Sequence, residues 1–456
     1  MFRGRENELK AVRDALGGNC NILVYGPRRV GKTTLLKEAV EDFPGTCVWY
    51  ECVKGSLEYN IELLAGAVAI ALGKSYLANI RNLFDLFQMI AEGGKRIVVV
   101  IDEYPYLKES REGGVVDSYF QRIIDGKYPG LSLVLCGSFI SMMRELLQKD
   151  NPLFGRFDLV MQVKPFDYFD ASLFYGEAPV RKKIAMYSVF GGSPFVLERI
   201  DPSRSVEENI EDLLLQEYSP VRETVENTLL SEIGKMGLAR EIVARIGNSR
   251  MKYNELEASL SVDARGSLDR ELKRLIMMQV VEKNYPINRR DDKKKSFYEL
   301  SDNLLRFYYT YVFPSRSNIV RLDPPSFFRL FVAESFGTFV SRRFEGIVRE
   351  YFVRLMRTGR IADVTDIGTY WYDDRTTKRN GEFDCVMKSK DGDYRVYEAK
   401  YYKNPMRSAE VEEEARKIRA IMELRVGRIG FVSSSGYERP DDRYDEIDGA
   451  MLYSFD

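Results

Sequence analysis

Short apolar runs and helical patterns alternate along the first 165 residues of the chain. The run at 97–101 consists of β-branched residues throughout, which is typical of a parallel strand buried on both faces. The predicted strands are 21–25, 46–51, 97–101, 131–137 and 159–163. Helical spacing of apolar residues predicts helices between them, the clearest at 57–72 and 80–91. The pattern predicts an α/β fold with a parallel sheet.

Residues 229–300 have the pattern of a winged helix, with helices followed by two strands around a charged wing at 288–295. The third helix, 266–278, is apolar on one face and carries Arg270, Lys273 and Arg274 on the other. A basic face suits the DNA backbone, but any amphipathic helix has a solvated charged face, so both interpretations stay open. The wing, with five basic residues against two acidic, is expected to be mobile.

The C-terminal part is expected to begin after the linker-like sequence Asp323-Pro324-Pro325. A long helix is predicted from Phe336 and strands from about 361, with a hairpin over 381–400. The expected division is an α/β core at 1–164, a helical lid at 165–225, a winged helix and connector at 226–322, and a second α/β domain at 323–456.

Composition narrows the chemistry that this chain can carry out. At 456 residues it is too long for one hydrophobic core, and 68 basic against 69 acidic residues give no overall basic field. No apolar stretch approaches the length that spans a bilayer, and the N-terminus lacks a signal-peptide pattern, so a cytoplasmic protein without a membrane partner is expected. The chain has no histidine, which excludes imidazole acid–base catalysis and histidine zinc sites.

The segment between the first strand and its helix has the pattern of a nucleotide-binding P-loop. Glycines at both ends let main-chain N–H groups converge on phosphate oxygens at the helix N-terminus, where Lys32 reaches the β- and γ-phosphates and Thr33 ligates Mg²⁺. The predicted ATP or ADP contacts are Gly26, Pro27, Arg28, Arg29, Val30, Gly31, Lys32, Thr33 and Thr34.

Acids and one hydroxyl follow the next strands, at the edge where the P-loop lies. Asp102 and Glu103 end the run at 97–101, so Asp102 is expected in the magnesium shell and Glu103 is expected to orient the attacking water. Ser138 is expected to sense the γ-phosphate and can also cap the following helix. Arg156 is a candidate for the arginine that stabilises transition-state charge, in its own subunit or across an interface; a surface salt bridge is the alternative.

Residues 1 to about 200 resemble the archaeal branch of the AAA-related STAND ATPases. The resemblance rests on the sequences FRGRENEL, GPRRVGKT, VVVIDEYPYL, LCGSFISMM and PLFGRF, in that order. It implies that Phe2 and Arg5 can cover the adenine, although a plain helix N-terminus fits them equally. The segment 190–195 is similar to the GxP element with which that class touches the nucleotide from its helical lid, which implies a nucleotide contact by Pro194. No clear second-sensor arginine is found.

The predicted hairpin carries an acid on one strand and Glu-x-Lys on the other. Glu398 and Lys400 share a face because strand side chains alternate, and a three-residue loop at 390–392 would pair Asp384 with Glu398, whereas a two-residue turn would pair it with Ala399. We expect the three-residue loop. About residues 335–456 resemble the PD-(D/E)xK, restriction-endonuclease-like superfamily. The resemblance implies Glu345, Asp384 and Glu398 as ligands of Mg²⁺ or Mn²⁺, Lys400 as the residue that positions water, and Glu382 as an outer acid.

Two functions are consistent with the sequence. The first is an ATPase that couples nucleotide state to a winged-helix and nuclease-like domain acting on DNA. The alternative is an ATP-gated regulatory switch whose C-terminal domain binds nucleic acid or a partner without cleavage. The sequence leaves open the physiological substrate, the trigger and whether the chain forms a homo-oligomer.

Overall fold

The computed structural model describes residues 2–92, 96–233, 237–247, 249–261, 265–290, 292, 294–374, 379–421 and 424–455. The chain divides into two compact units. The first comprises residues 1–165 with 193–195, and the second comprises 166–192 with 196–456. Among the described residues, no helix combines the length and the apolar character needed to cross a membrane.

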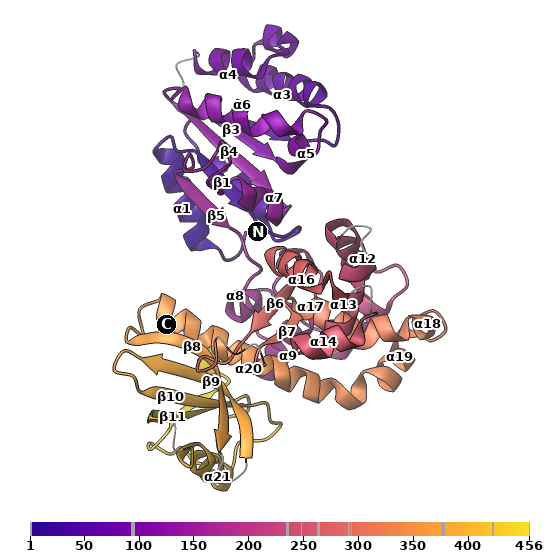
Figure 1. Cartoon of the computed structure of the whole chain (residues 1–456), viewed down its shortest axis with the longest axis vertical. Helices are drawn as coiled ribbons and strands as arrows, with labels where there is room; N and C mark the ends of the chain where they lie inside the picture. Colours follow the sequence, from indigo (N-terminus) through magenta and orange to yellow (C-terminus); the bar gives the residue numbers. More distant parts are fainter. Residues whose placement is uncertain are drawn as a thin grey trace. The chain divides into compact units, whose positions relative to one another are not determined.

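A five-stranded parallel sheet forms the centre of the N-terminal unit (Figure 1). Its strands are β1 (Ile22–Tyr25), β2 (Thr46–Glu51), β3 (Ile97–Asp102), β4 (Leu131–Gly137) and β5 (Leu159–Gln162). They lie in the order β2-β3-β4-β1-β5 and all pair in parallel. The three central strands are buried along their whole length, as their continuous apolar runs require. The predicted α/β fold is confirmed.

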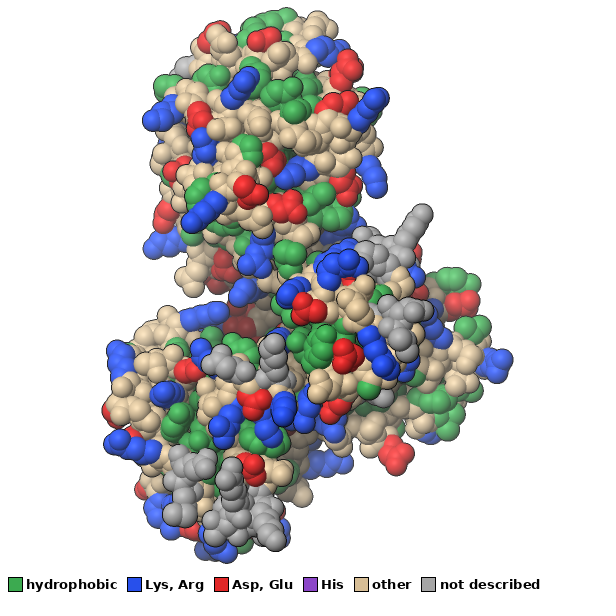
Figure 2. All heavy atoms as spheres, viewed as in Figure 1, with side chains coloured by type: hydrophobic (Ala, Val, Ile, Leu, Met, Phe, Trp, Pro, Cys, Tyr) green, Lys and Arg blue, Asp and Glu red, His purple; other side chains and the backbone are tan. Residues whose placement is uncertain are grey.

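Helices cover both faces of this sheet and form a separate apolar core on each. They are α1 (Glu6–Gly17), α2 (Lys32–Glu41), α3 (Leu57–Leu72), α4 (Leu83–Ala91), α5 (Pro105–Lys108), α6 (Gly113–Asp125) and α7 (Ile140–Glu145), with a 3-10 turn at Ser75–Asn79. Helix α4 begins three residues later than predicted. The Asn82 side chain explains this start, because it accepts hydrogen bonds from the main-chain N–H groups of Phe84 and Asp85. Basic and acidic side chains are interspersed over the visible surface of this unit, in keeping with the balanced charge (Figure 2).

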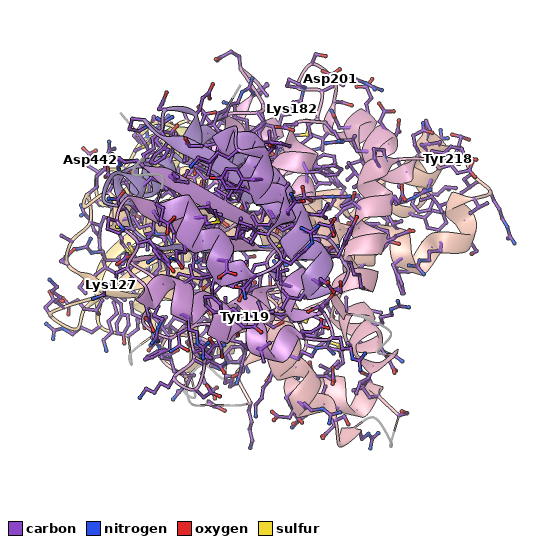
Figure 3. The ribbon with its side chains drawn as sticks, turned by 90° about the horizontal axis from the view of Figure 1, so that it is seen from above. Tyr119, Lys127, Lys182, Asp201, Tyr218 and Asp442 are labelled. Atoms are coloured by element: carbon purple, nitrogen blue, oxygen red, sulfur yellow. The ribbon has the colours of Figure 1, made fainter. Side chains whose placement is uncertain are left out.

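Helices dominate the middle of the chain. They are α8 (Tyr168–Ser172), α9 (Val180–Phe190), α10 (Pro194–Leu197), α11 (Val206–Ile210), α12 (Pro220–Ile233), α13 (Gly237–Gly247), α14 (Tyr253–Ser259), α16 (Leu268–Met277), α17 (Asn303–Phe307) and α18 (Arg316–Ile319), with turns at Glu211–Leu215, Tyr308–Val312 and Phe313–Ser315. The Lys182 ammonium donates to the Pro202 carbonyl over 2.6 Å and ties α9 to the loop at Asp201 (Figure 3). Strands β6 (Val281–Asn284) and β7 (Phe297–Leu300) pair antiparallel, so the two strands predicted around the wing are present.

A mixed five-stranded sheet forms the C-terminal part of the chain. Its elements are α19 (Pro324–Phe331), α20 (Ala333–Arg357), β8 (Val364–Asp374), β9 (Arg379–Ser389), β10 (Tyr394–Lys400), α21 (Ser408–Arg419), β11 (Val426–Ser433), β12 (Asp445–Asp448) and a turn at Met451–Tyr453. Strands β8, β9 and β10 pair antiparallel, and β10, β11 and β12 pair in parallel. The sequence predicted as a linker at Pro324 instead opens α19. Proline is tolerated in a first helical turn, and the Asp323 side chain caps it by accepting from the Ser326 N–H.

The wing of the winged helix docks on edge strand β8. The Ile287 N–H donates to the carbonyl of Thr369 over 2.8 Å, and the Asn288 amide exchanges two hydrogen bonds with the main chain of Trp371. The Lys295 ammonium lies 3.7 Å from the centre of the Trp371 ring. The expectation of a mobile wing is therefore wrong at these residues, because an edge strand offers unpaired main-chain groups that the wing can bind. Positions 291 and 293 of the wing lie outside the described residues.

Candidate functional site

The loop between β1 and α2 has the geometry of a phosphate-binding loop. Gly31 caps α2 with a φ of 90°, a left-handed conformation that favours glycine. The Lys32 ammonium is buried inside the loop, where it donates to the carbonyls of Gly26 and Pro27 over 3.0 and 2.8 Å. Thr34 lies exposed on the first turn of the helix. The Lys32 ammonium therefore lies inside the loop that the sequence predicts to bind the phosphates.

The segment at 193–195 packs against this loop. The Ser193 hydroxyl donates to the carbonyl of Arg29 over 3.2 Å, and the Arg29 guanidinium lies 4.2 Å from the centre of the Phe195 ring. A Cβ on Gly31 would be 3.5 Å from the Pro194 ring. Pro194 therefore lies beside the loop, at the place where the resemblance puts a nucleotide contact.

The two lead-in residues occupy different positions. The buried guanidinium of Arg5 donates to the carbonyls of Val30 and Lys164 over 2.9 and 2.7 Å, so it ties the P-loop to the end of β5. Phe2 is partly buried and packs against the core on the α1 and α2 side of the sheet. Arg5 thus supports the loop from within the protein, and adenine contact by Phe2 or Arg5 stays a prediction.

Two arginines that were expected near the nucleotide are held by protein groups. The Arg28 guanidinium donates to the Tyr106 hydroxyl over 3.1 Å and lies 5.0 Å from the centre of the Phe139 ring. Arg156 forms a bidentate ion pair with Asp125, with nitrogen–oxygen distances of 2.9 and 3.1 Å. This ion pair corresponds to the alternative given for Arg156 from the sequence, a surface salt bridge. An action on the γ-phosphate, which would require Arg156 to leave Asp125, stays a prediction.

A hydroxyl and a carboxylate meet between the P-loop and β3. The Thr33 hydroxyl donates to Asp102 Oδ2 over 2.8 Å, and Asp102 is buried at the end of the strand. Both are hard oxygen donors, and Mg²⁺ binds through one or two such groups together with substrate phosphates. The donor set therefore fits the expected magnesium ion.

The next acid is held by the neighbouring strand. Ser138, directly after β4, donates its hydroxyl to both carboxylate oxygens of Glu103 over 2.8 and 2.7 Å. Glu103 has a φ of 50°, which costs a non-glycine residue about 1–2 kcal/mol. Strain of this kind persists where the surroundings fix the residue, often at functional sites. Ser138 thus fixes the direction of the Glu103 carboxylate. The sequence did not predict this hydrogen bond.

In the C-terminal sheet, the hairpin between β9 and β10 has the predicted three-residue loop. The Ser389 N–H donates to the Asp393 carbonyl over 2.8 Å, and Gly392 between them has a φ of 92°. Tyr397 pairs with Cys385 at the end of the paired segment, in the register that a three-residue loop sets. The prediction for this loop is confirmed.

The acids of this hairpin are buried or half-buried, and Asp384 and Glu398 are engaged with the chain. Asp384 Oδ2 accepts a hydrogen bond from the Ala399 N–H over 3.0 Å, and the Lys400 ammonium donates to Glu398 over 3.2 Å. Burial raises the pKa of Glu345, Asp384 and Glu398, and repulsion from Asp384 raises it further at the two glutamates. Burial opposes the charged form of Lys400, but Glu398 and Glu414 outweigh it and raise the pKa of Lys400.

The carboxyl groups of the C-terminal site are hard oxygen donors of the type that suits Mg²⁺ or Mn²⁺. Mutual repulsion among Glu345, Asp384 and Glu398 is what a bound cation would relieve. Among the described residues, however, no group of three or more acids or cysteines is arranged to hold a metal ion. The ligand set at this site stays a prediction.

Sequence reasoning missed two arginines beside these acids. Arg349 donates to the main-chain carbonyl of Asp384 over 2.7 Å, and Arg250 donates to Glu382 over 2.7 Å. Arg349 could have been found, because it follows Glu345 by four residues on one helix and so shares its face. No local spacing in the sequence connects Arg250 with Glu382, because the two residues are 132 positions apart.

Comparison with known proteins agrees with this geometry. Residues 2–200 match the model of a family described as an ATPase domain predominantly from Archaea. Residues 308–418 match a family described as archaeal and bacterial proteins of unknown function. An uncharacterized protein of Methanocaldococcus jannaschii is 27% identical over 378 residues, which cover 82% of each chain.

Solved structures resemble the chain more distantly in sequence. The Walker-type ATPase of Pyrococcus abyssi is 19% identical, with a TM-score of 0.50, and the match covers 70% of this chain and 96% of that one. The ORC2 protein of Aeropyrum pernix is 14% identical, with a TM-score of 0.46 over 70% of this chain and 94% of that one. The first of these likenesses shows the fold. Together with the family match, it shows that the N-terminal part of the chain carries an archaeal-type P-loop ATPase domain.

Proposed function

We propose that the chain is a STAND/AAA-type ATPase that binds and hydrolyses ATP, and that its nucleotide state controls a winged helix and a nuclease-like domain acting on DNA. One observation carries the ATPase part of this proposal. Lys32, the Thr33–Asp102 pair and the Ser138–Glu103 pair stand together at the carboxyl edge of one parallel sheet. Ligands of open α/β sheets bind at this edge.

Each residue has a separate part in the proposed reaction. Lys32 exchanges its carbonyl partners for the β- and γ-phosphates. Thr33 and Asp102 would hold Mg²⁺, which would supply neutralisation of phosphate charge. Glu103 orients and polarises the attacking water, and Ser138 fixes the direction of that carboxylate. ADP and phosphate are the products.

ATP turnover by three lysine and glutamate variants tests this assignment. Lys32→Ala should abolish tight ATP binding, and Glu103→Gln should keep ATP binding while losing turnover. Lys37→Ala is the matched control, because Lys37 is exposed on the same helix and should leave turnover unchanged. Normal turnover by either Lys32→Ala or Glu103→Gln would contradict the assignment.

The C-terminal part of the proposal rests on the hairpin. In this hairpin the Asp384 carboxylate accepts a hydrogen bond from the Ala399 N–H, and the Lys400 ammonium donates to Glu398. Glu345, Asp384 and Glu398 would hold Mg²⁺ or Mn²⁺, which supplies Lewis-acid activation of a phosphodiester when bound. Lys400 would position the attacking water.

Incubation with plasmid DNA and Mg²⁺ or Mn²⁺, with and without ATP, tests nuclease activity. Cleavage should disappear in Asp384→Ala and Lys400→Ala. It should persist in Lys388→Ala, since Lys388 lies exposed on the same hairpin. Equal cleavage by all variants would show that the activity arises elsewhere, and no cleavage under any condition would remove the nuclease claim.

One observation favours a switch that binds without cutting. Lys400 lies 3.2 Å from Glu398 and 3.9 Å from Glu414, and Asp384 accepts from the main chain, so these groups are satisfied within the protein. This alternative predicts ATP-dependent binding of DNA or of a partner with no cleavage in the plasmid experiment.

A further inference from the structure

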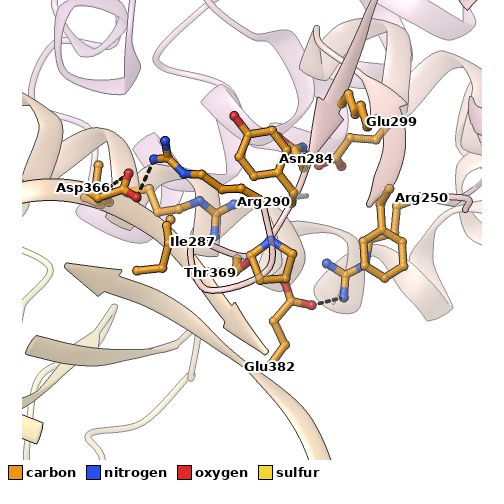
Figure 4. A pocket seen from close by; sticks show the side chains of 15 residues that line it. Arg250, Asn284, Ile287, Arg290, Glu299, Asp366, Thr369 and Glu382 are labelled. Atoms are coloured by element: carbon orange, nitrogen blue, oxygen red, sulfur yellow. Dashed lines mark hydrogen bonds and ion pairs between the residues drawn. The ribbon is translucent and has the colours of Figure 1, made fainter. Parts of the chain in front are cut away.

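A pocket of about 290 Å³ lies between the winged helix and the C-terminal sheet, within the second unit (Figure 4). One wall comes from residue 250 and from the strands and wing at 283–299. The other wall comes from α20, from 366–369 of β8 and from Glu382 of β9. The volume is near the lower end of the range for small-ligand sites, about 300–1,000 Å³, so the pocket has room for one nucleotide unit and not for a duplex.

Two ion pairs cross this pocket. Arg250 pairs with Glu382 over 2.7 Å, and Arg290 pairs with Asp366 (Figure 4). The two arginine side chains are about half exposed, at 48% and 54%, whereas their acid partners are only 13% and 21% exposed. Each pair is thus open to solvent on the side of its arginine. A phosphate can therefore replace these carboxylates, and arginine binds phosphate in bidentate geometry.

The pocket lining contains more basic than acidic side chains that can interact with a ligand. Lys283 and Arg349 also line the pocket. The third acid of the lining, Glu299, is neutralised from outside by Arg306 and Arg343, at 3.3 and 3.5 Å. A ligand that enters would thus meet four basic groups and would displace two carboxylates.

Aromatic rings lie beside the two pairing arginines. The Arg250 guanidinium is 4.6 Å from the centre of the Phe297 ring, and that of Arg290 is 5.9 Å from the centre of the Tyr285 ring. Both rings line the pocket. Stacking of a base on an aromatic ring or guanidinium is the common way in which proteins hold unpaired nucleotides. Phosphate-binding groups and stacking surfaces thus occur together here.

The pocket leads directly to the acids of the hairpin. Arg349 lines it and donates to the carbonyl of Asp384 over 2.7 Å. Glu382, which also lines the pocket, precedes Asp384 by two residues on β9. A strand with one nucleotide in the pocket would therefore continue past Asp384.

We propose that this pocket binds one nucleotide unit of a single nucleic-acid strand, whose phosphate replaces Glu382 and Asp366 as the partner of Arg250 and Arg290. The inference rests on the proposed function in one respect, that the C-terminal domain acts on nucleic acid. It does not require cleavage.

Fluorescence anisotropy of a labelled single-stranded oligonucleotide tests the proposal, with the full chain in EDTA and without ATP. Cleavage cannot occur under these conditions, so binding is measured independently of nuclease activity. Asp366→Asn should tighten binding severalfold, because it removes a carboxylate that competes for Arg290. Arg250→Glu and Arg290→Glu should each weaken binding by roughly tenfold or more. An excess of AMP should compete, and a matching duplex should bind more weakly.

Arg245→Glu is the control, because Arg245 is exposed on α13 outside the pocket and should leave affinity unchanged. The gain expected from Asp366→Asn guards against misfolding, since a damaged protein does not bind more tightly. The proposal is wrong if neither the wild type nor Asp366→Asn binds the strand. It is also wrong if Arg245→Glu weakens binding as much as Arg250→Glu, or if a duplex binds equally well. Unchanged affinity in Asp384→Ala, with no cleavage by the wild type, would remove the nuclease claim and leave this site standing.

Discussion

At the scale of single residues, the nucleotide site depends on pairs of side chains that the sequence cannot show as pairs. The P-loop pattern and the two acids after β3 predict which residues take part, because spacing fixes them relative to one strand or loop. Ser138 lies 35 residues beyond Glu103, and only strand order brings them together. Arg250 and Glu382 are separated by 132 positions in the sequence. Residue types were therefore predictable, and contacts across elements were not.

Ser138→Ala should lower ATP turnover without changing ATP affinity. The variant removes the hydroxyl that fixes the Glu103 carboxylate, and misplacement of a catalytic group can cost up to about 100-fold in rate. Steady-state turnover together with equilibrium ATP binding measures both effects. Ser110→Ala, whose hydroxyl donates only to a nearby carbonyl, is the control. A loss of affinity equal to the loss of rate would show that Ser138 supports binding instead.

Glu350 should make the stability of the second unit depend on pH. Burial, with a contribution from Asp167, raises the pKa of Glu350 from an ordinary 4.5 to about 7. The native state therefore holds a proton that the unfolded chain releases above 4.5. The resulting stability is full below that value and is lost as pH rises through about 7, by up to about 3 kcal/mol.

Glu350→Gln should remove this part of the pH dependence. Urea unfolding between about pH 5 and 8 measures it, with Glu334→Gln, exposed on the same helix, as the control. Parallel pH profiles of the wild type and Glu350→Gln would show that this carboxyl does not titrate as described.

At the scale of elements, local patterns predicted the strands of the sheet and the loop of the β9–β10 hairpin. The loop was predictable because Gly392 supplies the left-handed conformation that a three-residue turn needs. The docking of the wing on β8 was not predictable, since its partner lies about 80 residues away in the chain. A run of charged residues such as the wing indicates exposure when the sequence is considered alone. In the structure this run instead contacts edge strand β8.

Gly26→Ala should abolish ATP binding, whereas Gly17→Ala should not. A Cβ on Gly26 would lie 2.1 Å from the carbonyl oxygen of Val163, so the P-loop would have to move away from the end of β5. Gly17, the last residue of α1, has open space where its Cβ would lie. Equilibrium binding of a fluorescent ATP analogue compares the two variants. Equal affinities would show that the loop tolerates this displacement.

At the scale of the whole molecule, the chain folds as two units, and the nucleotide residues lie in the first. The segment 193–195 belongs to that unit although its neighbours in sequence belong to the second. Sequence patterns predicted α/β and helical regions in the correct order. Those patterns alone do not assign this short segment to the P-loop, although the family resemblance implies a nucleotide contact by Pro194; its place depends on contacts such as that between Ser193 and Arg29.

Mg-ADP should therefore stabilise one of two unfolding transitions. A ligand at 100 times its dissociation constant stabilises the unit that binds it by about 2.7 kcal/mol. Differential scanning calorimetry should show the transition of the first unit moving to higher temperature, with a smaller change in the other. Lys32→Ala should show neither change. Equal shifts of both transitions would mean that the units unfold together.

Isothermal titration calorimetry of the full chain with ATP in the presence of Mg²⁺ tests the central claim most directly. The account predicts saturable uptake of one ATP per chain, lost in Lys32→Ala and kept in Lys37→Ala. Absence of heat at any nucleotide concentration, or unchanged binding by Lys32→Ala, would contradict it.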